Sequence, residues 1–296
     1  MPDASSSTRT SSTVLLLADR SRPEAVEACG LIEQSLGTLD IPFVTGTTDE
    51  SEAIPDSPVP DVAIVIGGDG TMIAQTRRLV DLGIPMIGVN CGRLGFLAPF
   101  SPDTFHRHLE TVLRPDRALE HRMMLAISVE PADGSEAITR RAMNDAVITA
   151  GEPYRMIRMT TTIDGQDGPR LSGDGLVIAT PTGSTGHNAS AGGPIVDPRV
   201  EAIVVCPIAA QSLAFRPCVL DGDSCLEVVL TQVNEGTALV LDGQRRLPLQ
   251  PNDRIRFSRY ATPMKFVVCP GGPFWRILHD KLGWAAPPRE RGGDRS

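Results

Sequence analysis

The sequence predicts two domains, an α/β domain with a mostly parallel sheet followed by a β-rich domain. The chain has 296 residues, which exceeds the usual size of a single domain. Short, continuous apolar runs alternate with helical patterns up to about residue 120, as in a sheet covered by helices on both faces. Beyond that point helical patterns are scarce, and hairpin signals separate β-prone runs. We therefore assign residues 13–120 to the first domain and residues 121–273 to the second.

Strands and helices alternate through the first domain. Fully apolar runs predict buried strands, and apolar residues at three- and four-residue spacing predict helices. On these signals we expect strands at 14–18, 61–66 and 86–89 and helices at 23–36, 71–82 and 102–113. Ser101 is a good N-cap for the last helix, and Pro102 fits its first turn. This order is that of βαβ units, which place parallel strands in one sheet.

The second domain carries the signals of antiparallel sheets. The apolar run 125–129 leads into a Pro-Ala-Asp-Gly turn at 131–134. Asp164-Gly165 and Asp242-Gly243 also predict hairpins, because Asp-Gly pairs favour two-residue turns. The final segment, 274–285, is amphipathic and could pack on either domain; we assign it to the N-terminal one.

Composition and charge argue against several classes of function. The net charge of −8 and the pI of about 5.2 leave no basic surface for nucleic acid or an anionic membrane. No apolar run approaches the ~18 residues of a membrane span, and residues 1–12 lack the apolar core of a secretory signal. We therefore expect a cytoplasmic protein with disorder at residues 1–12 and 286–296. The six cysteines form no C-x-x-C pair, so we expect free thiols and no structural metal site.

The loop Gly67-Gly68-Asp69-Gly70-Thr71 follows a predicted buried strand and begins a predicted helix. Its glycines let the backbone approach a ligand closely, and the helix N-terminus favours a phosphate. Phosphates repel a carboxylate unless a cation mediates, so we expect Asp69 to hold Mg²⁺ through water or to act as a base on an attacking hydroxyl. The loop is neither a Walker A loop nor G-x-G-x-x-G. A tight turn with Asp69 as helix N-cap is the structural alternative.

Two further segments place polar groups near this loop. Residues 88–97 follow the next strand, and in a doubly wound sheet two successive strand ends point at one crevice. Phe96 in this segment could line that crevice or lie in the core. Asn144 and Asp145 precede an apolar strand, where they could grip ribose hydroxyls or cap a turn.

Residues 172–194 form the most specific segment of the chain. They place a short apolar strand between two loops dense in Gly, Ser and Thr, which suits a phosphorylated, polyhydroxylated ligand. The embedded strand and the lack of repetition argue against a linker. Ser184, His187 and Asp174 lie close in sequence, but without a G-x-S-x-G elbow they do not indicate a hydrolytic triad.

Together these segments resemble the NAD kinase family from about residue 61 to residue 284. Gly-Gly-Asp-Gly-Thr alone is shared with the diacylglycerol and sphingosine lipid kinases, and a close variant occurs in phosphofructokinases. More selective are the segment Gly-Val-Asn-Cys-Gly-Arg-Leu-Gly-Phe-Leu, the Asn-Asp pair before Ala-Val-Ile, and the stretch from Gly-Asp-Gly-Leu to Ala-Gly-Gly-Pro. Ser212–Pro217 and Lys281–Trp284 also fit.

The resemblance implies transfer of the ATP γ-phosphate to the 2′-hydroxyl of the adenosine ribose of NAD. Mg²⁺ or another divalent cation would be bound with ATP, the second domain would be a β-sandwich, and the chain would form a homodimer or homotetramer. Asp69 would face the 2′-hydroxyl as base or orienter. The residues implied for NAD binding are Gly70, Ile73, Phe96, Asn144, Asp145, Asp174, Thr182, Thr185, Gly186, His187, Ser190 and Asp242. Those expected to bind ATP or its phosphates are Gly67, Gly68, Gly70, Thr71, Asn90, Gly92 and Arg93.

The chain departs from the family pattern at two places. The family commonly has Ala-Tyr in place of Gly186-His187 and Glu in place of Asp145. Because His stacks over less area than Tyr, we expect weaker or retuned NAD binding. A soluble lipid kinase is one alternative, and it predicts an apolar tunnel in the β-rich domain. A non-catalytic NAD-binding protein of the same fold is the other, and the presence of Asp69 argues against it.

Overall fold

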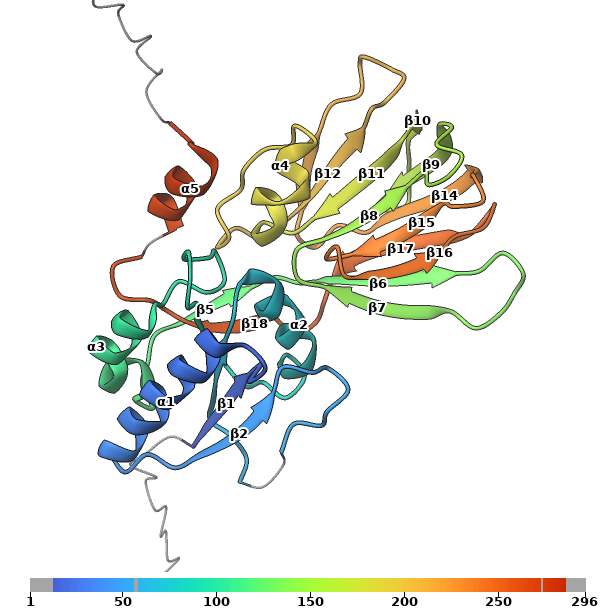
Figure 1. Ribbon diagram of the computed structural model, residues 1–296. Coiled ribbons are helices and arrows are strands. Elements are labelled where there is room, and N and C mark those ends of the chain that lie inside the picture. The colour runs from blue at the N-terminus through green and yellow to red at the C-terminus, as the bar shows by residue number, and fades with distance from the viewer. Residues whose placement is uncertain (1–12, 56–57, 273, 286–296) are drawn as a thin grey trace, which may run out of the picture.

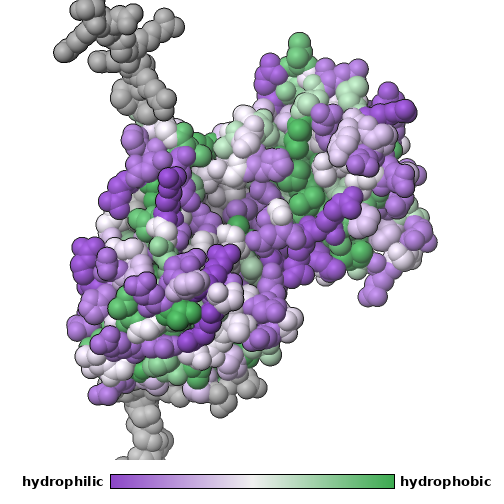
Figure 2. All heavy atoms as spheres, viewed as in Figure 1, coloured by the Kyte–Doolittle hydropathy of each residue, from purple (hydrophilic) through white to green (hydrophobic). Residues whose placement is uncertain are grey.

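The computed structural model describes residues 13–55, 58–272 and 274–285, which form two lobes (Figure 1). Figure 2 shows the same view in space-filling form, with hydrophilic side chains over much of the visible face. The expected disorder at residues 1–12 and 286–296 lies outside the described residues. Within them, no helix has the length and apolar character needed to cross a membrane.

A six-stranded sheet forms the first lobe, with the strand order β2-β1-β3-β4-β18-β5. All neighbouring strands are parallel except β18 and β5, which are antiparallel. The strands are β1 (Val14–Ala18), β2 (Phe43–Thr47), β3 (Val62–Ile66), β4 (Met86–Val89), β5 (Leu119–Arg122) and β18 (Met264–Val267). These pairings confirm the prediction of a mostly parallel sheet. Helices cover both of its faces, and β1, β3 and β4 are therefore completely buried.

Helices α1 (Pro23–Thr38) and α3 (Pro102–Leu113) pack on one face of this sheet, and α2 (Asp69–Leu79) packs on the other. Ser101 caps α3 as predicted, because its Oγ accepts a hydrogen bond from the Thr104 amide at 3.1 Å. Helix α2 begins at Asp69 rather than at the predicted Thr71.

Two antiparallel six-stranded sheets form the second lobe. Their orders are β10-β9-β14-β17-β6-β7 and β13-β12-β11-β8-β15-β16. The first sheet contains β6 (Leu125–Glu130), β7 (Ile138–Ala142), β9 (Ile157–Ile163), β10 (Gln166–Gly173), β14 (Leu226–Gln232) and β17 (Arg254–Arg259). The second contains β8 (Asp145–Thr149), β11 (Gly175–Ala179), β12 (Ala202–Ile208), β13 (Cys218–Asp221), β15 (Ala238–Leu241) and β16 (Arg245–Pro248).

One core fills the space between these two sheets. Ile127 and Phe257 from the first sheet and Ile148 and Leu239 from the second belong to the same buried cluster. The predicted β-sandwich is therefore confirmed. The hairpin prediction at Asp164-Gly165 also holds, because both residues have positive φ, as a two-residue turn between β9 and β10 requires.

The chain returns to the first lobe through β18 and the C-terminal helix α5 (Phe274–Leu282). Strand β18 pairs with β4 and β5, which corrects the assignment of all of residues 121–273 to the second domain. This pairing joins segments far apart in sequence, so no local signal announces it. On α5, the Phe274 ring packs against Phe96 of the first lobe, with 5.7 Å between the ring centres and 54° between the ring planes, so the predicted return of this segment is confirmed.

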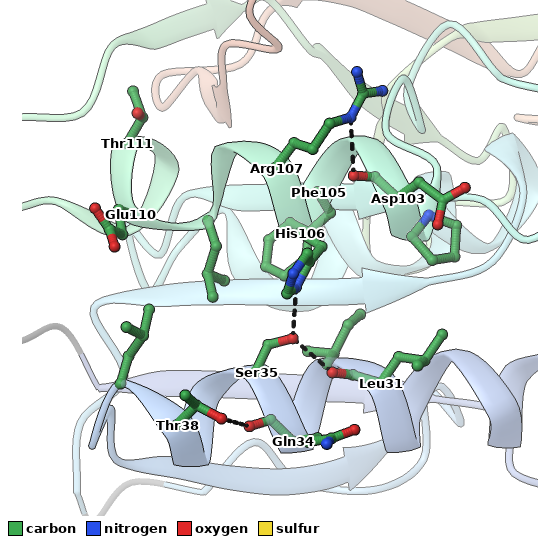
Figure 3. A pocket seen from close by; sticks show the side chains of 14 residues that line it. Leu31, Gln34, Ser35, Thr38, Asp103, Phe105, His106, Arg107, Glu110 and Thr111 are labelled. Carbon is green, nitrogen blue, oxygen red and sulfur yellow. Dashed lines mark hydrogen bonds between the residues drawn. The ribbon is translucent and has the colours of Figure 1, made fainter.

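A groove of about 740 Å³ runs between α1 and α3 (Figure 3). His106 Nδ1 lies 2.9 Å from Ser35 Oγ across it. None of the site residues predicted from the sequence lines this groove, so its size does not make it the candidate active site.

Candidate active site

A smaller pocket, about 380 Å³ in volume, brings together residues from both lobes and from α5. Six of the predicted site residues line it: Asp69, Phe96, Asn144, Thr182, Thr185 and Gly186. Leu97, Lys281 and Leu282, for which no role was predicted, complete the wall. The pocket thus lies at the carboxyl ends of β3 and β4, where an open α/β sheet binds ligands.

Asp69 is held in place by the loop that follows β4. Its Oδ1 accepts a hydrogen bond from the Leu97 amide at 3.0 Å, and its Oδ2 accepts one from the Phe96 amide at 3.2 Å. The N-cap of α2 is Gly68, so Asp69 is not the helix cap that the structural alternative required. Its carboxylate faces the second glycine loop instead, and the two loops meet at this one side chain.

Gly95 makes this approach possible. A Cβ at Gly95 would lie 1.9 Å from Asp69 Oδ1, which no real contact allows. The backbone at residue 95 packs so closely on the Asp69 carboxylate that only glycine, which has no Cβ, fits at this position.

Lys281 of α5 approaches Asp69 from the other side. Its Nζ lies 3.1 Å from Asp69 Oδ2 and 5.5 Å from the centre of the Phe96 ring. Lys281 lies in a segment that fits the family pattern, but no role was predicted for it. Because 212 residues separate it from Asp69, the contact has no local signature.

The second lobe contributes Asn144 and Thr182 from two segments packed on each other. The Thr180 amide donates to the Asn144 carbonyl at 2.9 Å, and a Cβ at Gly183 would lie only 2.0 Å from that carbonyl oxygen. Among the described residues, neither Asn144 Oδ1 nor Thr182 Oγ1 has a hydrogen-bond partner, although both atoms are buried. An unpaired buried oxygen costs free energy, so both atoms are candidates to bind a ligand hydroxyl.

Asp242, which was expected to close the site from the second domain, is not among the residues that line this pocket. Its Oδ1 accepts from the Asn144 amide at 2.7 Å, and its Oδ2 accepts from Arg77 Nη1 at 3.0 Å. Burial raises the pKa of Asp242, and the backbone amides and Arg77 act in the opposite direction. Asp242 therefore supports the backbone of the Asn144 segment from behind the pocket wall.

Asp145 is also buried and does not line the pocket. A Cβ at Gly186 would lie 3.9 Å from Asp145 Oδ2, so Asp145 stands directly behind Gly186. Burial and, second, the nearby charge of Asp242 raise the pKa of Asp145 to about 7.

Several predicted residues lie outside the pocket wall. Ile73 is buried in the core between α2 and the sheet, so its predicted place in the NAD pocket is not observed. Asp174 is at the opposite end of β11 from the Thr182 loop, about 16 Å of strand away. His187 and Ser190 are exposed on the short helix α4 (His187–Ser190).

None of the predicted phosphate-binding residues lines the pocket. These are Gly67, Gly68, Gly70, Thr71, Asn90, Gly92 and Arg93. Asn90 stabilises its own loop, because its Nδ2 donates to the Arg93 carbonyl and its Oδ1 accepts from the Gly92 amide. No cluster of three or more His, Cys, Asp or Glu side chains that could hold a metal occurs among the described residues.

Comparison with known proteins identifies the family of this site. A model of the ATP-NAD kinase N-terminal domain matches residues 32–118, and a model of the C-terminal domain matches residues 143–269. The chain belongs to the NAD kinase family. It is 38% identical over 226 residues to the NAD kinase of Rhodopirellula baltica, covering 76% of this chain and 72% of that relative. The NAD kinase of Geobacter sulfurreducens is 40% identical over 224 residues, covering 76% of this chain and 78% of that relative.

Two solved structures share the fold of this NAD kinase family member. Yeast NADH kinase complexed with NADH has a TM-score of 0.81 at 24% identity and covers 95% of this chain and 90% of its own. An NAD kinase from Archaeoglobus fulgidus in complex with ATP has a TM-score of 0.73 at 24% identity, and the match covers 92% of this chain and 98% of that protein's chain. The α/β lobe and the sandwich are therefore the architecture found in NAD(H) kinases.

Proposed function

We propose that this chain transfers the γ-phosphate of ATP to the 2′-hydroxyl of the adenosine ribose of NAD, giving NADP. One observation carries the proposal beyond family membership. The pocket places the Asp69 carboxylate in the same wall as Asn144 and Thr182, whose buried side-chain oxygens have no hydrogen-bond partner among the described residues. A ribose has several hydroxyls to donate to such oxygens, and one of them can be presented to Asp69.

In this reaction Asp69 orients the 2′-hydroxyl and accepts its hydrogen. The hydroxyl oxygen attacks the γ-phosphorus, the bond from that phosphorus to the β-γ bridging oxygen breaks, and ADP leaves with the electron pair. The proton of the hydroxyl passes to the Asp69 carboxylate and then to water. The amides of Phe96 and Leu97 fix the direction of the carboxylate, which reduces the reorganisation needed at the moment of transfer.

A divalent cation such as Mg²⁺, when bound with ATP, would neutralise charge on the phosphates. Asp69 is the one carboxylate among the residues lining the pocket, and the described chain has no larger cluster of metal ligands. The residues therefore fit a cation held mainly by the triphosphate and water, with Asp69 as the protein group that could contact it.

The adenosine ribose of NAD would lie against Asn144 and Thr182. Both oxygens are buried and have no hydrogen-bond partner among the described residues, so each side chain would have to rotate to meet a ligand hydroxyl. Thr185 and Gly186 line the same wall. Asp145 supports this wall from behind Gly186, which differs from the direct ribose contact that the family pattern implies.

The two alternatives receive less support. A lipid kinase needs an apolar tunnel in the second lobe, but side chains from both sheets pack into one core there. A non-catalytic protein gives no reason for an Asp69 held by two backbone amides at the pocket wall. We further propose that the enzyme is cytoplasmic and that it forms a homodimer or homotetramer. Light scattering on the purified chain tests the oligomeric state.

Formation of the product tests the proposal. The purified protein is incubated with ATP, Mg²⁺ and either NAD or diacylglycerol, and NADP and phosphatidic acid are both measured. We expect NADP, phosphorylated at the 2′ position by ³¹P NMR, and no phosphatidic acid. Phosphatidic acid, or the absence of both products from a folded protein that binds NAD, would overturn the proposal.

A further inference from the structure

Among the described residues that line the pocket, a single side chain is positively charged. Of the nine lining residues, Lys281 is the one cation and Asp69 the one anion, and their side-chain atoms lie 3.1 Å apart. The side chains of Lys281 and Asp69 are 33% and 29% exposed, so both are accessible from the pocket. An ammonium has three N–H donors, and the Asp69 contact is the one hydrogen bond recorded for Lys281 within the described residues.

Helix α5 fixes Lys281 in this position. Ile277 and Leu278 are 4% and 0% exposed, and they precede Lys281 by four and three residues, which places all three on one face of the helix. Phe274 of the same helix packs against Phe96, the residue whose amide binds Asp69. The packing of α5 therefore directs the ammonium at the carboxylate rather than into solvent.

Composition makes a lysine at this position unusual. The chain has 28 Lys and Arg residues, of which two, Lys265 and Lys281, are lysines, leaving 26 arginines. Lys265 lies beside Gly83, past the C-terminal end of α2, whereas Lys281 lies at the start of α2. The length of α2, about 16 Å for its eleven residues, therefore separates the two sites.

We propose that Lys281 is a catalytic residue, which leaves Asp69 when ATP binds and contacts the γ-phosphate. This inference rests on the proposed function. The pocket must hold a phosphoryl group with several negative charges, and Lys281 is the lining side chain that can neutralise them. Its departure also frees Asp69 Oδ2 to accept the hydrogen of the 2′-hydroxyl.

In the transfer itself Lys281 stays protonated and forms no covalent bond. The bond between the γ-phosphorus and its bridging oxygen breaks, the new bond from phosphorus to O2′ forms, and the proton goes to Asp69 as described above. Lys281 follows the oxygens of the phosphoryl group through this step, where charge is spread over all three.

Two other roles for the same contact make different predictions. A surface ion pair of no consequence is worth little, so removing Lys281 would leave the kinetics unchanged. A latch that blocks Asp69 would make the enzyme faster, or lower the KM for ATP, once Lys281 is removed. The proposed role predicts a slower enzyme.

Chemical labelling tests the position of Lys281 in the unmodified protein. The probe is an acyl phosphate of ATP, in which an amine near the γ-phosphate attacks the acyl carbon, an amide forms and ATP is released. Mass spectrometry then reports the acylation of each lysine. We expect acylation of Lys281 that excess ATP suppresses, and little at Lys265, which serves as the internal control. Acylation that excess ATP does not suppress, or none at Lys281, would overturn the proposal.

Kinetics of two variants test the role itself. For Lys281→Met we expect kcat to fall by about 10²-fold, the loss typical of one transition-state donor. The Kd for NAD should change by less than about threefold, because the ribose contacts are elsewhere. Lys281→Arg should recover part of kcat, and Lys265→Met should match the unmodified enzyme. If the unmodified protein makes NADP and Lys281→Met makes it at the same rate, this inference fails while the proposed function stands.

Discussion

Gly95→Ala tests the link between the two glycine loops and Asp69. The added Cβ would lie 1.9 Å from Asp69 Oδ1 and 2.6 Å from its Cγ, whereas an ordinary contact begins near 3.4 Å. The carboxylate must therefore retreat by roughly 1 Å or more, and it loses the amide hydrogen bonds of Phe96 and Leu97. A misplacement of this size costs about 10²-fold in rate. We expect kcat for NADP formation to fall by about that factor.

A glycine with open space around it provides the control. A Cβ at Gly30, in α1, would meet no atom within 4 Å, and neither Gly30 nor Gly95 has a left-handed backbone. Gly30→Ala should therefore keep kcat within about twofold. Rates are measured with a dehydrogenase that reduces NADP specifically, and the melting temperature of each variant is recorded. Equal rates for Gly95→Ala and Gly30→Ala would refute this prediction.

Three further predictions concern the second lobe and its contact with the first. Burial and the charge of Asp242 raise the pKa of Asp145 to about 7, so between pH ~4 and ~7 the folded protein holds a proton that the unfolded chain has released. The free energy of unfolding should thus fall as pH rises through this window, by on the order of 4 kcal/mol, and urea titrations of Asp145→Asn should lack that slope. Arg77→Met leaves the buried Asp242 carboxylate without its guanidinium, so it should lower the free energy of unfolding by roughly 3 kcal/mol in urea titrations; a double variant with Asp242→Asn that is no more stable than Arg77→Met would contradict this. His187→Tyr adds stacking area on α4 and should tighten NAD binding several-fold in a calorimetric titration, and an equal or weaker affinity would end the stacking argument.

Local signals in the sequence predicted the parts of the fold that depend on local chemistry. The Ser101 cap and the Asp164-Gly165 turn follow from the hydrogen-bonding and backbone preferences of those residues. Strand β18 could not be assigned to its sheet in this way. The four residues of β18, Met264–Val267, predict a strand but not the sheet to which it belongs. Their pairing with β4 and β5 places them in the first lobe.

The same distinction applies to the active site. Asp69 stood out because a carboxylate is unexpected in a phosphate-binding loop, and the structure holds it at the pocket wall. The sequence could not show that the Asp242 carboxylate lies beneath the backbone of residues 143–145, because that placement follows from strand register. Lys281 could not be recognised because its partner is set by how α5 packs on the first lobe.

Asp69→Asn tests the central claim most directly, because it removes the charge of the proposed base while nearly preserving its shape. Turnover of NAD to NADP and the Kd for NAD are measured on the same preparation. We expect kcat to fall by at least about 10²-fold, with the Kd for NAD within a few-fold of the unmodified protein. Undiminished turnover would show that Asp69 takes no part in the chemistry.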